Sequence, residues 1–171
     1  SLDNISQALG QGEGYHILHF LSHGMFSDDR KRAVLYLENE AGNIRPTGDK
    51  ELAQKLASLE HPPSLVFLAA CESARRDAEN PNPFVGLAAR LVQVGTPAVV
   101  AMQDTISIGT ARTFTQSFYA HLFEHGIVDK AVNQARSAID ATGEWMVPVL
   151  YTRLKDGRLF AQEAIGKGRE A

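Results

Sequence analysis

Two apolar stretches of the sequence, YHILHFLSHG at residues 15–24 and SLVFLAACES at residues 64–73, decide the fold of this chain. Each is a short, uninterrupted apolar run that ends at polar or reactive side chains. Such a run, bounded by glycine, proline or polar residues, is typical of a strand that is buried on both faces. The two stretches therefore predict neighbouring parallel strands, with His23 directly after the first strand and Cys71 directly after the second.

Helix-like and strand-like patterns alternate along the rest of the chain. A third apolar run, AVVAM at residues 98–102, predicts another buried strand, which ends at Gln103-Asp104. The other expected elements are amphipathic helices at about residues 2–9, 49–59, 84–94, 107–125 and 128–141, and hairpins at about 34–45 and 147–160. This alternation predicts an α/β fold, with a mostly parallel central sheet flanked by helices on both faces.

Length and composition limit the possible classes of function. The chain has 171 residues, which fits one domain, and its net charge is −3, from 17 basic and 20 acidic side chains. That balance gives no electrostatic footprint for nucleic acid or for an anionic membrane, and no apolar run approaches the roughly 18 residues of a membrane span. The single cysteine excludes an internal disulfide and favours a reducing, cytoplasmic setting. We therefore expect one domain over residues 1–171 that binds neither nucleic acid nor membrane.

The residues that follow the predicted strands indicate a thiol-based chemistry. Sites in parallel sheets form at the carboxyl ends of the strands, where His23, Cys71 and Asp104 are expected. A cysteine attacks a carbonyl carbon as the thiolate, so it needs a basic partner such as an imidazole. The separation of 71 − 23 = 48 residues leaves room for a hairpin and a crossover helix, and it is close to the spacing of about 50 in caspases. We expect His23 and Cys71 to form a catalytic dyad.

Neighbouring residues complete this candidate site. Gly24 has no side chain to obstruct a substrate, and its N–H, together with that of Cys71, could donate to a developing oxyanion. Asp104, with Gln103 beside it, is a candidate substrate-binding residue that would favour a Lys or Arg side chain. The alternative for Asp104 is an N-cap of the next helix or a solvated loop acid, and the sequence leaves both open.

The same residues allow two other interpretations, a buried inert cysteine and a metal site. A lone cysteine is most often a buried, inert side chain, but Cys71 stands between an apolar run and polar residues, where the chain leaves the core. A metal-dependent hydrolase built on His19, His23 and Cys71 is the weaker alternative. Side chains alternate along a strand, so His16 is expected on the face opposite to His19 and His23, and the three histidines cannot converge on one metal. A packed or edge role is expected for His16 and His19. The sequence contains no G-x-S-x-G elbow, P-loop or G-x-G-x-x-G motif. We expect neither a metal nor another cofactor.

The two deciding stretches also resemble the motifs of a known family. Residues 15–24 resemble the hydrophobic strand followed by S/G-H-G of CHAT domains, which are caspase-like modules of the caspase–hemoglobinase superfamily. Residues 68–74, LAACESA, resemble the L-S-A-C-E-T/S-A segment of the same family. Further similar segments lie at residues 86–95, 99–101, 118–119 and 145–151. The resemblance covers about residues 13 to 160, and the two motifs are specific in this order and at this spacing.

The resemblance implies a fold and a mechanism. The fold would be the three-layer caspase–hemoglobinase sandwich, and the activity that of a regulated cysteine endopeptidase. His23 would be the general base, Cys71 the nucleophile that forms a thioester acyl-enzyme, and the Gly24 and Cys71 amides the oxyanion hole. CHAT modules usually form the C-terminal part of larger, mainly prokaryotic proteins, often beside TPR repeats or other sensor domains. The implied partners are therefore a protein substrate and an activating sensor domain or partner protein, in the same chain or in trans.

The sequence departs from the superfamily in two respects. The caspase pattern Q-A-C-R-G is absent, with Ala69 in place of the Gln and Glu72 in place of the Arg, so cleavage after Asp is not implied. The superfamily fold also begins with a strand and a helix before the His strand, and we expect this first strand to be missing from the chain, as in a fragment of a longer protein. The alternative to a peptidase is a non-catalytic CHAT-like scaffold or interaction module of a larger signalling or defence protein.

Overall fold

The computed structural model describes residues 1–12, 14–22, 24–27, 32–39, 41–70 and 83–161 of the chain. In chain order its elements are α1 (Leu2–Leu9), β1 (Ile17–Ser22), β2 (Gly24–Ser27), β3 (Arg32–Glu38), β4 (Ile44–Gly48), α2 (Asp49–Ala57), β5 (Leu65–Ala70), α3 (Pro83–Gln93), β6 (Ala98–Met102), α4 (Ile108–His125), α5 (Val128–Ala138), the 3₁₀ helix η2 (Asp140–Thr142) and β7 (Pro148–Thr152). The helix expected at 2–9 and the strand expected at 98–102 have the predicted bounds. The helix expected at 128–141 ends at Ala138, and η2 follows it.

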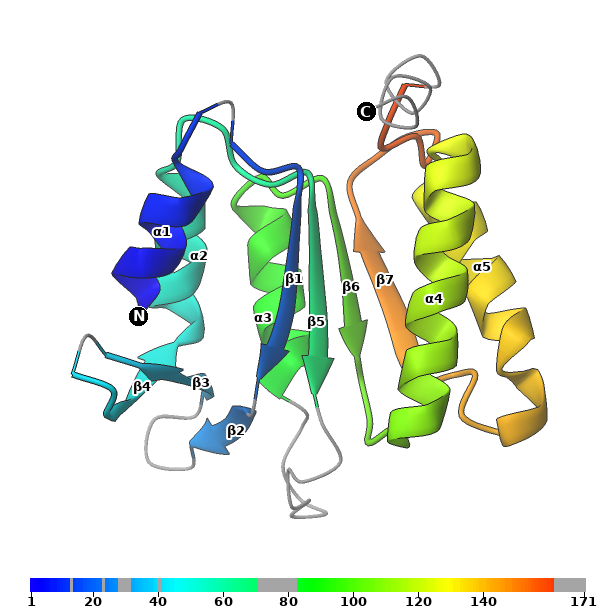
Figure 1. The fold of residues 1–171 in the computed structure, drawn as a ribbon, viewed down its shortest axis with the longest axis horizontal. Helices are drawn as coiled ribbons and strands as arrows, with labels where there is room; N and C mark the ends of the chain where they lie inside the picture. Colours follow the sequence, from blue (N-terminus) through cyan, green and yellow to red (C-terminus); the bar gives the residue numbers. More distant parts are fainter. Residues whose placement is uncertain (13, 23, 28–31, 40, 71–82, 162–171) are drawn as a thin grey trace.

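Four strands form the central sheet, in the order β1-β5-β6-β7 (Figure 1). β1 pairs with β5, and β5 with β6, in parallel, whereas β7 runs antiparallel to β6. The residues of β6 and residues 65–69 of β5 are buried, which explains why these segments are apolar without interruption. The predicted mostly parallel sheet is confirmed.

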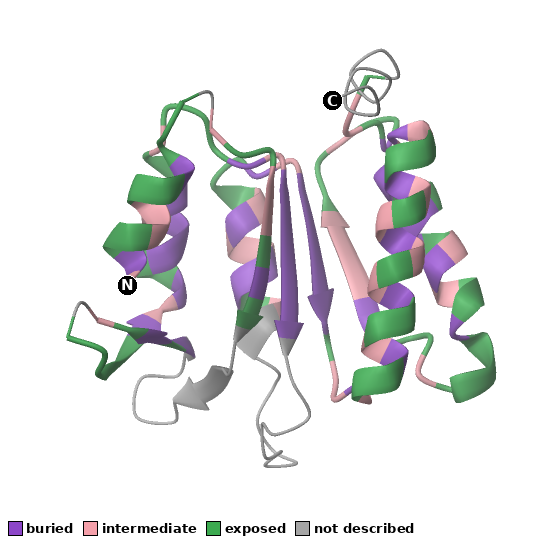
Figure 2. Ribbon diagram, in the orientation of Figure 1, coloured by how far each residue is buried: buried purple, intermediate pink, exposed green. Residues whose placement is uncertain are grey.

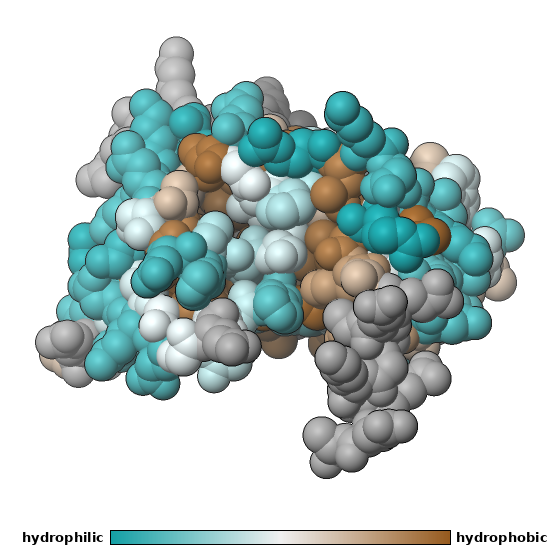
Figure 3. Space-filling view, turned by 90° about the horizontal axis from the view of Figure 1, so that it is seen from above, coloured by the Kyte–Doolittle hydropathy of each residue, from teal (hydrophilic) through white to brown (hydrophobic). Residues whose placement is uncertain are grey.

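Helices cover both faces of this sheet, as predicted. Val66 and Leu68 of β5 lie in a core shared with α1, α2 and α3, whereas Leu65 and Phe67 lie in a second core shared with α4 and α5. Side chains of a strand alternate between its two faces, so one strand supplies both cores. In Figure 2 the buried residues follow the central strands and the inward sides of the helices. Seen from above, hydrophilic residues form most of the outer rim, and apolar residues show in patches on either side of a paler central strip (Figure 3).

A second, three-stranded antiparallel sheet has the order β2-β3-β4. The hairpin predicted at 34–45 is its β3–β4 pair, and the Asn39 side-chain oxygen closes the turn by accepting from the amides of Ala41 and Asn43. Strand β2, which begins at Gly24, was not predicted. It lies beyond the carboxyl end of β1, beside the edge of the molecule where the parallel strands end (Figure 1).

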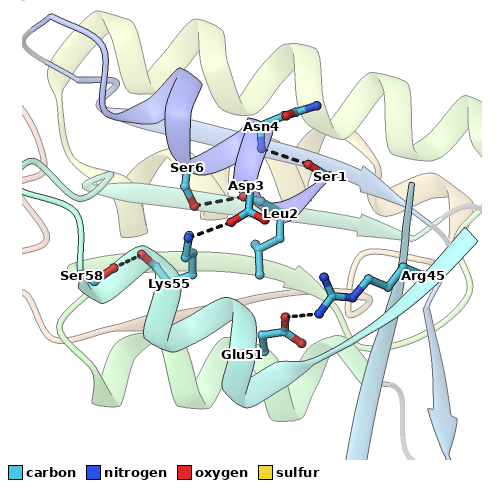
Figure 4. Close-up of polar contacts among 9 residues, drawn as sticks. All are labelled: Ser1, Leu2, Asp3, Asn4, Ser6, Arg45, Glu51, Lys55 and Ser58. Atoms are coloured by element: carbon cyan, nitrogen blue, oxygen red, sulfur yellow. Dashed lines mark hydrogen bonds and ion pairs between the residues drawn. The ribbon is translucent and has the colours of Figure 1, made fainter. Parts of the chain in front are cut away.

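Helix α1 is attached to α2 by apolar packing and by one exposed ion pair (Figure 4). Leu2 and Leu9 are buried in the core that α2 also enters, and the Lys55 ammonium lies 2.9 Å from the Asp3 carboxylate. Ser1 begins the helix as its N-cap, because its hydroxyl accepts from the Asn4 amide at 3.1 Å. Exposed ion pairs contribute little, so the leucines hold α1 in place.

The prediction of a hairpin at 147–160 is wrong. Strand β7 pairs with β6, and the chain after it crosses to the turn between α4 and α5 instead of returning along β7. There the Val128 amide donates to the Gly157 carbonyl, and the Leu159 amide donates to the Gly126 carbonyl, each at 2.8 Å. Backbone partners far away in the sequence thus replace the local pairing that the turn-like Lys155-Asp156-Gly157 suggested.

Gly157 carries a specific stability prediction. Its φ is +67°, and a Cβ added there would overlap the Asp129 carboxylate, whereas Gly42 has a φ of +75° with nothing within 4 Å of such a Cβ. Gly157→Ala should therefore lower the free energy of unfolding by about 1 kcal/mol more than Gly42→Ala, because only the first adds a clash to the positive-φ cost. Urea unfolding of both variants measures this difference. Equal losses would show that the Asp129 side chain moves aside without cost.

None of the helices in the described part of the chain combines the length and the apolar character needed to cross a bilayer.

Candidate active site

The carboxyl ends of β1, β5 and β6 meet at one edge of the central sheet (Figure 1). The last residues of β1 and β5, Ser22 and Ala70, are paired with each other. His23 and Cys71 follow these two residues directly in the chain, and both lie outside the described residues. The predicted neighbouring parallel strands are confirmed, and the dyad itself stays a prediction.

His19 of β1 is held by contacts within the fold. Its ring stacks on Phe67 of β5, with centroids 4.4 Å apart, and its Nδ1 shares a 3.0 Å hydrogen bond with the Tyr119 hydroxyl of α4. Burial lowers the pKa of His19 and raises the pKa of Tyr119. His19 is therefore a neutral, hydrogen-bonded side chain at neutral pH, still exposed on the edge strand β1, which fits the packed or edge role expected for it.

His16 lies one residue before β1, and its ring centroid is 6.2 Å from that of Phe160. Among the described residues, no group of three His, Cys, Asp or Glu side chains is placed to hold a metal ion. The alternative metal site also includes His23 and Cys71, which lie outside the described residues.

Gly24, the predicted oxyanion donor, is the first residue of β2 and pairs with Leu35 of β3. The backbone next to position 23 is therefore fixed by an antiparallel ladder. The ladder locates Gly24, and its role as a donor stays a prediction.

Gln103 and Asp104 follow β6 at the same edge. The Gln103 amide donates to the Val147 carbonyl at 2.9 Å, and its side-chain Nε2 donates to the Met146 carbonyl at 2.6 Å. The Asp104 carboxylate accepts from the Thr105 amide. Gln103 thus ties β6 to the segment that leads into β7. The interpretation of Asp104 as an N-cap is wrong, because Ser107 has that position in α4.

The sequence did not point to the loop at residues 143–147, which lies against Gln103. The Glu144 carboxylate accepts from the Ser107 amide at 2.9 Å and from the Ser107 hydroxyl at 3.1 Å, at the N-terminus of α4. Trp145 and Met146, which follow it, are large apolar side chains with exposed fractions of 42% and 57%. The family-like segment at residues 145–151 begins before β7, which starts at Pro148. Exposure of an apolar pair cannot be inferred from its sequence.

The Glu144 contacts predict an acid-sensitive loop. Hydrogen bonds from the Thr110 hydroxyl and the Ser107 amide lower the pKa of Glu144 from its ordinary value of 4.5. A carboxylate whose pKa is lower in the folded state than in the unfolded state stabilises the fold at pH values above its unfolded-state pKa. This contribution is lost as the pH falls through the folded-state pKa. Trp145 is the only tryptophan of the chain, so its fluorescence should report a transition of the loop below pH 4.5.

Two variants test the origin of that transition. Glu144→Gln should abolish it, because the amide does not titrate. Glu124→Gln should keep the transition. Glu124 is a matched control because a hydrogen bond with His121 also lowers its pKa, but it lies in the last turn of α4, at the other end of that helix from Ser107. Far-UV circular dichroism over the same pH range separates loop release from global unfolding. An unchanged transition in Glu144→Gln would assign it to another group.

Comparison with known proteins adds the family. A family model described as CHAT domain matches residues 1–146, and a search of curated proteins gave no match. The matched region includes both deciding stretches and the elements from α1 to α5. CHAT domains are related to caspase-like cysteine peptidases, and the helix–sheet–helix layers agree with that relationship. The chain belongs to the CHAT domain family.

Proposed function

We propose that this CHAT domain is a regulated cysteine endopeptidase in which Cys71 is the nucleophile and His23 the general base. The observation that supports this most directly is the pairing of Ser22 with Ala70 at the ends of β1 and β5. The residue that follows each of these strands in the chain is one Cα–Cα step of about 3.8 Å beyond the paired end, and neighbouring strands lie about 4.8 Å apart. This spacing supports contact between the Cys71 thiol and the His23 imidazole, because these residues directly follow the paired strand ends in the chain.

The proposed reaction requires only groups of the chain and water. His23 takes the thiol proton of Cys71, and the thiolate attacks the carbonyl carbon of the scissile peptide bond. The backbone amides of Gly24 and Cys71 stabilise the oxyanion that forms. The C–N bond then breaks, His23 donates its proton to the leaving amine, and a thioester remains. Water attacks the thioester with His23 again as the base, which releases the carboxylic acid and restores the free thiol.

Gln103 and Asp104 are proposed to contact the substrate from the β6 side. Their position supports this, because both follow β6 at the edge where β1 and β5 end. A substrate side chain that reaches Asp104 would be basic, since a carboxylate favours Lys or Arg.

The proposal includes a regulatory partner, a sensor domain or partner protein in the same chain or in trans, and no cofactor. Its support is the resemblance to CHAT modules that stand beside such domains. Comparing the cleavage rate of this domain with that of the same domain attached to its native flanking sequence, or mixed with the partner, tests it.

Labelling of Cys71 tests the dyad directly. The chain has one cysteine, so thiol labelling by iodoacetamide reports on Cys71 without further mapping. At pH 7 His23→Ala should slow labelling by about tenfold or more, because a thiol without a basic partner has a pKa near 8.5 and little thiolate. His61→Ala, at an exposed histidine between α2 and β5, is the control and should label at the wild-type rate. Equal rates in all three proteins would contradict the dyad and favour the non-catalytic interaction module.

A further inference from the structure

The loop at residues 143–147 lies at the same edge of the sheet as the candidate dyad. Met102, the last residue of β6, pairs with Pro148, the first residue of β7. Because β7 is antiparallel to β6, the segment before Pro148 lies where the parallel strands end (Figure 1). The loop therefore borders any peptide that crosses this edge on the β7 side.

The backbone of this loop is fixed from two sides. Gln103 donates to the carbonyls of Met146 and Val147, and Glu144 accepts from Ser107 at the start of α4. Loops that hold side chains for binding work best when their geometry is set before the ligand arrives. The hydrogen bonds to Gln103 and Ser107 provide this preorganisation.

The side chains that this fixed backbone presents are apolar. Trp145 and Met146 are both substantially exposed, and Trp145 also lines an open pocket of about 320 Å³, which among the described residues it shares with the polar side chains of Arg136, Ser137 and Asp140. Neighbouring parts of the described chain therefore leave the indole partly uncovered. Rigid aromatic side chains with adjacent open space are the usual anchors of peptide and protein contacts.

The distance to the candidate nucleophile fits a peptide substrate. β5 and β7 are separated by one strand, β6, which corresponds to about 10 Å at the usual strand spacing of about 4.8 Å. An extended peptide advances about 3.3 Å per residue. A peptide held across the edge with its scissile bond at the end of β5 would bring a side chain about three residues away to this loop.

We propose that Trp145 and Met146 form a subsite for a large apolar side chain of the peptide substrate, about three residues from the scissile bond. Glu144 is a positioning residue that holds the loop, and Gln103, proposed above to contact the substrate, also binds the loop backbone. This inference rests on the proposed peptidase function and adds the chemical class of a substrate residue to it. It is independent of the contact proposed for Asp104, which concerns a different substrate side chain.

Binding can be measured separately from cleavage. In a Cys71→Ser variant, acetylated hexapeptide amides with Phe or Leu about three residues from the scissile bond should change the fluorescence of Trp145. The same peptides with Gly at that position should bind at least about tenfold more weakly. The expected factor follows from the free energy of burying one large apolar side chain. Equal binding of the Phe and Gly peptides at every position would overturn the subsite.

Cleavage kinetics identify the residues. Trp145→Ala and Met146→Ala should each lower kcat/KM for the Phe peptide about tenfold, and Trp145→Phe should restore most of it. Val94→Ala is the matched control, because Val94 is an exposed apolar residue (40%) next to Gly95, at the opposite end of the sheet. Iodoacetamide labelling of Cys71 should be equal in all four variants.

The outcomes separate this inference from the proposed function. Loss of kcat/KM with unchanged labelling supports the subsite. Equal kcat/KM in Trp145→Ala, Met146→Ala and Val94→Ala overturns the subsite and leaves the peptidase intact. Peptides that bind at Trp145 but are never cleaved by the wild type overturn the peptidase and leave an apolar peptide-binding surface.

Discussion

Cys71→Ser should reduce peptide-bond cleavage by at least about a thousandfold. A serine hydroxyl is close to the thiol in size but is not ionised at neutral pH, so the substitution removes the attacking thiolate with little change in side-chain volume. Removal of a catalytic nucleophile in other hydrolases costs a thousandfold to a millionfold in rate. Initial rates on a positional library of fluorogenic peptides measure the effect, with the domain in its native flanking sequence so that an activator can act.

The controls for this experiment use the non-additivity of residues that act together. His23→Ala should cost a similar factor, and the double variant should be hardly worse than either single one, because the base has no role without the nucleophile. Circular dichroism and urea unfolding must be alike in all variants. Wild-type cleavage by Cys71→Ser would remove the basis for the peptidase, and additive losses in the double variant would mean that the two residues act separately.

The parts of the fold that could be predicted are those whose burial appears directly in the sequence. β5 and β6 lie between two layers of helices, so every position is apolar and the runs at 64–70 and 98–102 identify them. The amphipathic helices follow from their apolar periodicity in the same way. The shared edge at which the strands preceding His23, Cys71 and Asp104 end could also be predicted from the pattern, because the carboxyl ends of neighbouring parallel strands lie together.

The parts that could not be predicted depend on partners far away in the sequence. β2 is only four residues long, GMFS, and it is a strand because β3 offers it an antiparallel edge. The segment at 158–160 resembles a returning hairpin strand, yet backbone groups of Gly126 and Ile127 bind it instead. The Trp145 loop is placed by Glu144 and Ser107, which are 37 residues apart. Local patterns contain no information about such pairs.

Phe67→Ala should lower the free energy of unfolding by about 3 to 5 kcal/mol, the range for removing a fully buried phenylalanine. Phe67 has no exposed surface, and its ring centroid lies 4.4 Å from that of His19, 5.6 Å from that of Phe118 and 5.8 Å from that of Tyr119. The ring belongs to the closely packed aromatic cluster between β5 and α4, so filling the space would require its neighbours to repack. The substitution also removes the stacking contact between β1 and β5, four residues before each strand reaches a candidate catalytic residue.

The matched control is Phe123→Ala, which removes an aromatic ring from the same cluster at a partly exposed position. Phe123 stacks on Tyr119 with centroids 6.0 Å apart but is 46% exposed, so its removal should cost less than about 1 kcal/mol. Urea unfolding, followed by circular dichroism, measures both variants, and unchanged m-values would show that the denatured states are comparable. Similar losses would mean that the core closes over the space left by Phe67. Labelling of Cys71 in the folded Phe67→Ala variant, without urea, links this packing to the site. Slower labelling than in the wild type would mean that the aromatic packing between β1 and β5 holds the two strand ends in register for the proposed dyad.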